Sequence, residues 1–403
     1  MPSSSPPSTS SPSSAAPTPP APPRPVPLFE LATQWQVIRN DVEAAVKEVL
    51  DTQQYTSGAT SGPFVGRFEE HLGRIVNAQV IALSSGTDAI LAALMALGVG
   101  RDENDTPHEV ITTPFTFFAT AGCIVRAGAR PVFVDIDPAT FLMDLKQTAT
   151  AITPRTRAIV PVHLYGQMLD TAALAAIAKP QKLAIIEDAA QCIGARDQHG
   201  HQIAENAACA CLSFYPTKNL GAAGDAGALV TRDSDLATRF RQTRQHGETE
   251  RYHHSFVGGN FRMDALQAAV LNVKLKWLTQ WNDRRRAIAA YYTQRFITDS
   301  RGAIIPPAEI PGAFHVYHQY VIRVPGGKRD ALRDHLSKNG VGSNIYYPKP
   351  LHLQTCFANL GYKKGDFPIT EKACDEVLAL PIFPELTDSQ LERVANTVLS
   401  FFH

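Results

Sequence analysis

Short apolar segments recur along the chain and alternate with stretches in which apolar residues have helical spacing. These segments, rich in Val, Ile, Ala and Leu, predict strands at 80–83, 110–112, 131–135, 158–162, 183–187, 209–214 and 228–231. Helices are predicted after the first two of them, at 88–97 and 119–127. Short buried strands separated by helices are typical of a mostly parallel sheet that is covered on both faces. The pattern therefore predicts an α/β fold, in which ligands bind at the carboxyl ends of the strands.

The segments on either side of this region predict further helices and a second, smaller unit. Helices are expected at 35–51, 68–76 and 328–339, with a loop at 53–66, and residues 319–324 alternate like a strand. One long helix is predicted over 264–295, because apolar residues recur there at spacings of three or four: Leu266, Val270, Val273, Trp277 and Trp281. We therefore predict a large domain over 27–284 and a smaller C-terminal α/β domain over 285–403.

The first 26 residues differ in composition from the rest of the chain. They are almost entirely Ser, Pro, Ala and Thr, and they lack the apolar segment of a secretory signal. Such a segment buries too little apolar surface to fold, so we predict a disordered tail over 1–26. No segment approaches the roughly 18 apolar residues that are needed to span a membrane, so no membrane partner is expected.

Charge and cysteine content narrow the function classes. Lys plus Arg and Asp plus Glu number 38 each, and this balance argues against nucleic acid as the main partner. The six cysteines include no Cys-x-x-Cys pair, which indicates reduced thiols in a cytoplasmic protein. His163, His246, His253 and His254 match no zinc spacing, so no metal site is predicted. The run 284–286, three arginines, is interpreted as a solvated helix face.

The most informative candidate for chemistry is Lys218. It lies in the segment 213–219, with Ser213 and Thr217 as possible phosphate donors, and the glycine-rich run 221–227 follows. A lysine amine in such a pocket can form a Schiff base with an aldehyde cofactor. The alternative is an ordinary solvated loop lysine.

Three other segments follow predicted strands and are expected at the same crevice. The turn 84–88, with two serines, a glycine and a threonine before a helix, suits a phosphate, although such residues also cap helices. The aromatic residues of 114–118 can stack on a planar ring or belong to the core. In the segment 187–191, Asp188 can hold a pyridine nitrogen protonated or cap the next helix.

Together these motifs resemble the sugar aminotransferases of the DegT/DnrJ/EryC1/StrS family, a branch of the fold-type I enzymes that use pyridoxal 5'-phosphate (PLP). The resemblance covers about residues 27–403. It is carried by the segments 85–89, 116–117, 134–137, 161–167, 187–191, 213–221 and 259–264. It implies a large PLP-binding domain and a homodimer with shared active sites.

The resemblance also assigns roles to individual residues. It implies that Lys218 forms the Schiff base with PLP and shuttles a proton, and that Asp188 pairs with the pyridine nitrogen. Gln191 is expected at the ring hydroxyl and Phe117 on the ring face. The phosphate is expected to be held by Gly86, Thr87 and Ser213 and, from the neighbouring subunit, by Asn260.

The family aminates keto groups on nucleotide-linked sugars, usually with glutamate as donor and 2-oxoglutarate as product. The glutamine at position 191 resembles the subgroup that acts at C-3. The segments 260–262 and 345–352 are similar to those of enzymes that act on UDP-linked 3-keto-glucuronic acid derivatives. Substrate contacts are therefore expected from Arg262, Tyr346, Tyr347 and His352. The loop 55–66 looks longer than usual in the family and is expected to line the sugar pocket.

Four other functions stay open at this point. Amination at C-4 and amination of a cyclitol such as scyllo-inosose would use the same fold. Sugar dehydration is disfavoured, because the related dehydratases replace the lysine by histidine and this chain has Lys218. A regulator that binds PLP without catalysis would need a DNA-binding module, which the short Pro/Ser-rich tail cannot supply.

Overall fold

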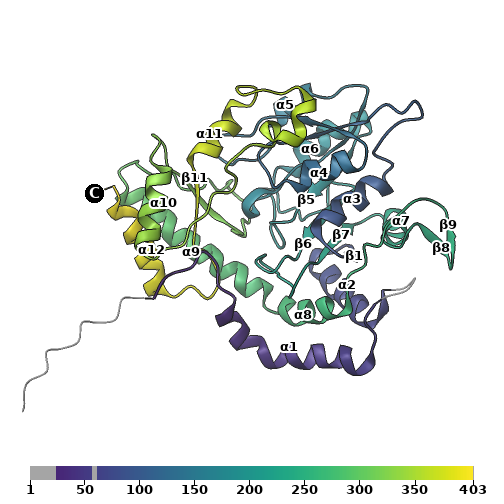
Figure 1. Ribbon diagram of the computed structural model, residues 1–403, viewed down its shortest axis with the longest axis horizontal. Helices are drawn as coiled ribbons and strands as arrows, with labels where there is room; N and C mark the ends of the chain where they lie inside the picture. Colours follow the sequence, from purple (N-terminus) through teal and green to yellow (C-terminus); the bar gives the residue numbers. More distant parts are fainter. Residues whose placement is uncertain (1–23, 57–60, 403) are drawn as a thin grey trace, which may run out of the picture.

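The computed structural model describes residues 24–56 and 61–402 (Figure 1). Residues 1–23 of the predicted tail lie outside this range. Val26, at the end of the predicted tail, is 1% exposed and pairs with Val341 near the C-terminal part of the chain. Packed structure has therefore begun by Val26, one residue before the predicted start of the large domain.

A seven-stranded sheet forms the centre of the molecule, in the order β1-β7-β6-β5-β4-β2-β3. Strand β7 runs antiparallel to both of its neighbours, and the other neighbouring pairs are parallel. The strands are β1 (Gln79–Leu83), β2 (Glu109–Thr112), β3 (Arg130–Phe133), β4 (Thr156–Ile159), β5 (Ala184–Asp188), β6 (Cys209–Ser213) and β7 (Gly227–Thr231). All seven predicted strands and the α/β fold are confirmed.

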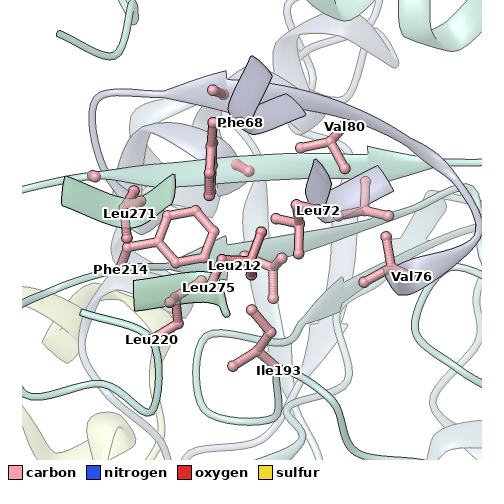
Figure 2. Packing of buried hydrophobic residues seen from close by; sticks show 14 of the residues in the cluster. Phe68, Leu72, Val76, Val80, Ile193, Leu212, Phe214, Leu220, Leu271 and Leu275 are labelled. Atoms are coloured by element: carbon pink, nitrogen blue, oxygen red, sulfur yellow. The ribbon is translucent and has the colours of Figure 1, made fainter. Parts of the chain in front are cut away.

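Helices cover both faces of this sheet, because alternate strand residues point to opposite sides. Ile81 and Leu83 pack with the apolar residues of α3 (Gly86–Ala96), α4 (Ala119–Arg126) and α7 (Ser234–Arg244). Val80 and Ala82 pack on the other side, against α2 (Gly62–Val76) and α8 (Ala265–Leu275). Figure 2 shows this second cluster, where Phe68, Leu72 and Val76 of α2 meet the sheet and α8. At the β2 end of this same side lie α5 (Leu145–Thr150) and α6 (Thr171–Ala178).

The predicted helix over 264–295 is two helices. Helix α8 ends at Leu275 and α9 (Leu278–Asp299) begins three residues later. Between them the Trp277 N–H donates to the Lys274 carbonyl, a tighter turn than that of an α-helix. The break lets α8 pack on α1 (Ala32–Thr52) while α9 continues into the C-terminal unit (Figure 1). The helical spacing of apolar residues continues through the break, so the sequence pattern did not indicate that the helix is interrupted.

The C-terminal unit has its own hydrophobic core. Its strands β10 (Tyr320–Arg323) and β11 (Val377–Leu380) pair antiparallel, beside α9, α10 (Arg329–Lys338), α11 (Pro368–Glu376) and α12 (Asp388–Ser400). The predicted strand at 319–324 and helix at 328–339 are confirmed. The predicted boundary at 284/285 falls inside α9, which contributes Ile288, Tyr292 and Phe296 to this core.

The predicted loop 53–66 is shorter in the structure. Helix α2 begins at Gly62, so residues 62–66 are helical, and residues 57–60 lie outside the described range. The strands β8 (Glu248–Glu250) and β9 (His253–His254) follow the C-terminal end of α7 and form a hairpin that extends from the body of the molecule (Figure 1). None of the helices in the described part of the chain is long and apolar enough to cross a membrane.

The arginines of 284–286 do not form a solvated face. Arg285 is 6% exposed, and its guanidinium donates to the carbonyls of Tyr317, His318 and Ile382. Arg286 pairs with Glu309 at 3.0 Å. The acceptors of Arg285 are at least 32 positions away in the sequence, so the local charge pattern could not reveal them.

Candidate active site

Four of the strand ends predicted to carry chemistry lie at one edge of the sheet. Strands β2, β5 and β6 are parallel through β4, and β1 is parallel to β6 because both are antiparallel to β7. Their carboxyl ends lead into the segments 84–87, 113–118, 188–191 and 213–218. The edge therefore brings a helix N-terminus, aromatic residues, a carboxylate and a lysine into one region.

The turn between β1 and α3 presents backbone donors. The Ser85 side chain caps α3 by accepting from the Asp88 N–H at 3.0 Å, and the Ser84 hydroxyl donates to the Asp88 carboxylate at 2.6 Å. The first amides of a helix, here those of Gly86 and Thr87, have no intrahelical acceptor. A helix N-terminus of this kind favours an anion such as a phosphate.

Glycines bring this turn into close contact with the neighbouring strands. A Cβ at Gly86 would lie 2.7 Å from the Cβ of Ser213, at the end of β6. A Cβ at Gly227, in β7, would lie 2.3 Å from the Ser85 carbonyl carbon. Real Cβ atoms do not approach other atoms this closely, so both positions require glycine. The predicted phosphate residues Gly86, Thr87 and Ser213 therefore come together.

Asp188 is a buried carboxylate at the end of β5. One carboxylate oxygen accepts from the Thr120 hydroxyl at 2.7 Å, and the other accepts from the Ala190 N–H at 3.2 Å. Burial raises the pKa of Asp188, while these two hydrogen bonds and the charges of Lys218 and His163 oppose the rise. A buried carboxylate of this kind gains from a further cationic partner.

Lys218 lies on the loop that follows β6, and its own N–H donates to the Tyr215 carbonyl at 2.8 Å. Burial lowers the pKa of the Lys218 amine to about 8, and the charge of Asp188 opposes this shift. The two groups thus influence each other, as expected if they lie in one pocket. Near neutral pH a fraction of such an amine is uncharged, and only an uncharged amine is a nucleophile.

Gln191 is fixed by two hydrogen bonds. Its side-chain oxygen accepts from the Tyr165 N–H at 2.7 Å, and its side-chain nitrogen donates to the Tyr347 hydroxyl at 3.2 Å. Burial raises the pKa of the Tyr347 phenol, so this hydroxyl stays protonated near neutral pH. The side-chain nitrogen of Gln191 keeps one further N–H that it can donate to a ligand, which suits a ring hydroxyl as acceptor.

The three phenylalanines of 115–118 have different surroundings. Phe115 is fully buried and belongs to the core, which was one of the two interpretations of the aromatic residues in 114–118. Phe117 is 57% exposed and has its ring centroid 6.3 Å from that of Tyr347. Phe118 stacks on Phe357. Of the three, Phe117 has an exposed ring beside a residue that contacts Gln191, as its predicted stacking role requires.

The other predicted substrate residues have different surroundings. The backbone of Arg262 pairs with Leu83 at the end of β1, next to the turn that precedes α3. Tyr346 accepts a hydrogen bond from the Tyr165 hydroxyl through its carbonyl. His352 is 1% exposed and bonds to Glu371 at 3.0 Å, so its ring has an internal partner.

Asn260 is the remaining predicted cofactor residue, and it lies on an exposed strand segment. Its backbone pairs with Gln245, at the end of α7 and close to the β8–β9 hairpin. Its side chain is exposed, which is compatible with a contact to a second copy of the chain.

Sequence reasoning missed the residues that support the predicted ones. Thr120 donates to Asp188, Tyr165 holds Gln191, and Asn219 joins the Lys218 loop to His318 at 3.2 Å. Thr120 stands just after the phenylalanines, whereas Tyr165 and Asn219 lie inside the segments 161–167 and 213–221, but sequence reasoning gave none of the three a role. Their partners are distant in the sequence, so only the fold reveals the contacts.

Comparisons with known proteins give one consistent result. A family model described as the DegT/DnrJ/EryC1/StrS aminotransferase family matches residues 36–399. A relative from Geobacillus stearothermophilus, named pleiotropic regulatory protein, is 46% identical over 93% of this chain and 98% of its own length. A UDP-N-acetyl-3-dehydro-alpha-D-glucosamine 3-aminotransferase from Acidithiobacillus ferrooxidans is 37% identical over 94% of this chain and 98% of its own.

Solved structures agree with this result. The chain is similar to S. venezuelae DesV in complex with a ketimine intermediate, with a TM-score of 0.89, 37% identity and coverage of 94% and 99% of the two chains. It is also similar to NtdA from Bacillus subtilis with the bound cofactor PMP, with a TM-score of 0.86, 33% identity and coverage of 95% and 86%.

Proposed function

The chain belongs to the DegT/DnrJ/EryC1/StrS aminotransferase family, whose members use PLP, and we propose that it aminates the C-3 keto group of a nucleotide-linked sugar with glutamate as donor. Sugar aminotransferases that act on UDP- and dTDP-linked sugars are among its relatives. The observation that carries the proposal is the placement of Lys218 and the buried Asp188 at the ends of the neighbouring strands β6 and β5, where the charge of each shifts the pKa of the other and the pKa of Lys218 falls to about 8.

The residues at this edge fit PLP. The α3 amides and the Ser213 side chain would hold the phosphate, in the close-packed turn that Gly86 and Gly227 allow. Asp188, buried without a cationic hydrogen-bond partner of its own, suits a protonated ring nitrogen. When bound, PLP supplies an electron sink that stabilises negative charge on the carbon that loses its proton.

The chain's own residues would then orient the reaction and move the proton. Lys218 would anchor the cofactor and, once released, carry the proton between the donor's α-carbon and the cofactor, because its lowered pKa lets it accept and give up a proton near neutral pH. Phe117 would cover one ring face, and Gln191 would donate to the ring hydroxyl.

Support for the C-3 position comes from Gln191 and from the relatives. The relatives from Acidithiobacillus ferrooxidans and Pseudomonas aeruginosa carry names that specify a 3-dehydro and a 3-oxo sugar, respectively. We propose that Tyr347, held by Gln191, and Tyr346 face the sugar, and that Arg262 binds a carboxylate of the substrate bidentately. His352 would act at the sugar only if its bond to Glu371 opened.

We also propose a cytoplasmic homodimer in which each subunit completes the other's site. Asn260 would reach the partner's phosphate, since its side chain is exposed on the segment that leaves the β8–β9 hairpin. Tyr252 and Val257, also in this region, are 76% and 85% exposed, and apolar side chains this exposed are typical of a surface that a partner covers.

A reverse-direction assay tests the reaction. Purified protein with PLP and 2-oxoglutarate is offered aminated UDP- and dTDP-sugars and scyllo-inosamine, and glutamate formation is measured. We expect 3-amino nucleotide sugars to react fastest and Lys218→Ala to abolish turnover, while Lys364→Ala, at an exposed loop lysine, leaves it unchanged. A wild-type protein that binds no PLP would overturn the proposal. Preference for a 4-amino sugar or the cyclitol would replace C-3 amination by that reaction.

The name of the Geobacillus stearothermophilus relative supports a second candidate, a regulator. Lys218 and its surroundings favour catalysis, because a protein that only senses PLP has no need of a proton-transferring amine. A mobility shift with sequence-specific DNA and the intact protein distinguishes the two. Sequence-specific binding without amination would establish the regulator.

A further inference from the structure

The loop that carries Lys218 is tied to the C-terminal unit through the next residue, Asn219. Asn219 is 5% exposed, and both its side-chain nitrogen and its side-chain oxygen are hydrogen-bonded. The nitrogen donates to the Asn282 side chain at 2.8 Å and to the Val316 carbonyl at 3.0 Å, and the oxygen lies 3.2 Å from Nδ1 of His318. Because the nitrogen donates twice, the oxygen must accept, and Nδ1 of His318 therefore carries the hydrogen.

His318 is held as a neutral hydrogen-bond donor. It is 6% exposed, and burial together with the charges of Lys218 and Arg285 keeps its pKa well below the usual range. A neutral imidazole with hydrogen on Nδ1 has one fixed orientation toward Asn219. His318 lies close enough to Lys218 for the lysine charge to disfavour protonation of the imidazole.

The segment around His318 is itself anchored from both domains. From α9, Arg285 donates to the His318 carbonyl at 3.3 Å. From the large domain, the Val316 N–H donates to the Gly166 carbonyl at 3.0 Å and the Gln319 N–H to the Tyr165 carbonyl at 3.3 Å. The segment 316–319 is therefore fixed by contacts to both domains, and it can hold the Lys218 loop, which it contacts, in place.

The same segment also connects to the other side of the candidate site. Tyr165, which accepts from Gln319, donates its own N–H to Gln191 at 2.7 Å. The segment 316–319, which precedes β10, thus contacts both Asn219, next to Lys218, and the backbone of Tyr165, which hydrogen-bonds to Gln191.

We propose that His318 is a positioning residue that sets the orientation of Lys218 through Asn219. The inference rests on the proposed function, because it concerns how the amine of Lys218 meets the cofactor. His318 does not touch the cofactor or the substrate in this scheme. Its role is to keep the Lys218–Asn219 backbone in one place relative to the residues around Gln191.

The test compares variants of His318 in the protein loaded with PLP. His318→Leu removes the donor, whereas His318→Asn retains an N–H near the position of Nδ1. The measurements are kcat and KM for glutamate and for the sugar, together with the visible circular dichroism per bound cofactor, which reports how the lysine holds the ring. His71→Leu is the matched control, since His71 makes the same Nδ1 contact to an asparagine, Asn272, at 3.1 Å between α2 and α8.

We expect His318→Leu to lower kcat about 10-fold or more, to change KM by less than about 3-fold and to alter the circular dichroism. His318→Asn should restore both signals, and His71→Leu should leave both at the wild-type level. Wild-type kcat and dichroism in His318→Leu, or no recovery in His318→Asn, would overturn the inference. If His318→Leu does not fold, Asn219→Ala must show the same two changes, and wild-type values there overturn it as well. A wild type that binds no PLP overturns the proposed function instead.

Discussion

Replacing Lys218 by methionine should stabilise the cofactor-free protein. Burial lowers the pKa of the Lys218 amine from the usual 10.5 to about 8, and each pKa unit corresponds to about 1.4 kcal/mol. The folded state therefore carries a cost of at most about 3.4 kcal/mol for keeping the amine charged at pH 7. The side chain is only partly shielded from water, and Asp188 loses an opposing charge in the variant, so we expect a net gain of about 1–2 kcal/mol.

The gain should depend on pH in a defined direction. Above about pH 10.5 the amine is neutral in both the folded and the unfolded chain, so Lys218 costs nothing. As the pH falls to about 8, the unfolded chain binds the proton and the folded chain does not, so the cost grows. Below about pH 8 the full cost is present. Lys218→Met should therefore be most advantageous at and below neutral pH, and the advantage should disappear toward pH 10.5.

The assay is urea unfolding of both cofactor-free proteins at equal concentration, at several pH values between 7 and 10.5. Methionine keeps the unbranched apolar part of the lysine side chain, so little packing is lost. Lys364→Met is the matched control and should change the free energy of unfolding by less than about 0.5 kcal/mol. A variant that is no more stable than wild type at pH 7, or whose advantage is the same at every pH, would refute the reasoning.

Three further substitutions test other parts of the structure. Asp188→Asn should lower kcat about 100-fold or more with little loss of folding, measured by steady-state kinetics and thermal unfolding, because it removes the charge that we propose pairs with the cofactor's ring nitrogen. Gly227→Ala should destabilise the protein by about 1–3 kcal/mol and weaken PLP binding, whereas Gly66→Ala, with nearest contact at 3.9 Å inside α2, should be neutral or stabilising. Arg285→Met should cost about 2–4 kcal/mol of unfolding free energy, and Arg284→Met, whose ion-pair partner is exposed, less than about 1.

The sheet and most of the candidate site could be predicted because the sequence patterns that specify them are local. A short apolar run bounded by polar residues specifies a buried strand, and the residue that follows it is placed at the sheet edge. Asp188 ends β5 and Lys218 lies on the loop that follows β6, so their placement at one edge of the sheet follows from the parallel order of these strands. The predicted phosphate turn benefits from the same rule, since it follows β1.

The contacts that position these groups could not be predicted because they join residues far apart in the sequence. Thr120 meets Asp188 across 68 positions, His318 meets Asn219 across 99, and Gln191 meets Tyr347 across 156. The first depends on how α4 packs beside the end of β5, and the other two on how the C-terminal unit docks on the large domain. The partner of His352, Glu371, lies only 19 positions away but on a separate element, α11, so no single local pattern joins the two residues.

Stability and chemistry make opposite demands on the end of the sheet. Burial moves the pKa of Asp188 up and that of Lys218 down, so each group is held in surroundings that disfavour its charge. A fold selected for stability alone would favour apolar residues at both positions. The chain nevertheless keeps both charged groups at adjacent strand ends. Thr120 donates to Asp188, and Asn219 fixes the loop beside Lys218. A ligand that needs both charges at once accounts for this arrangement.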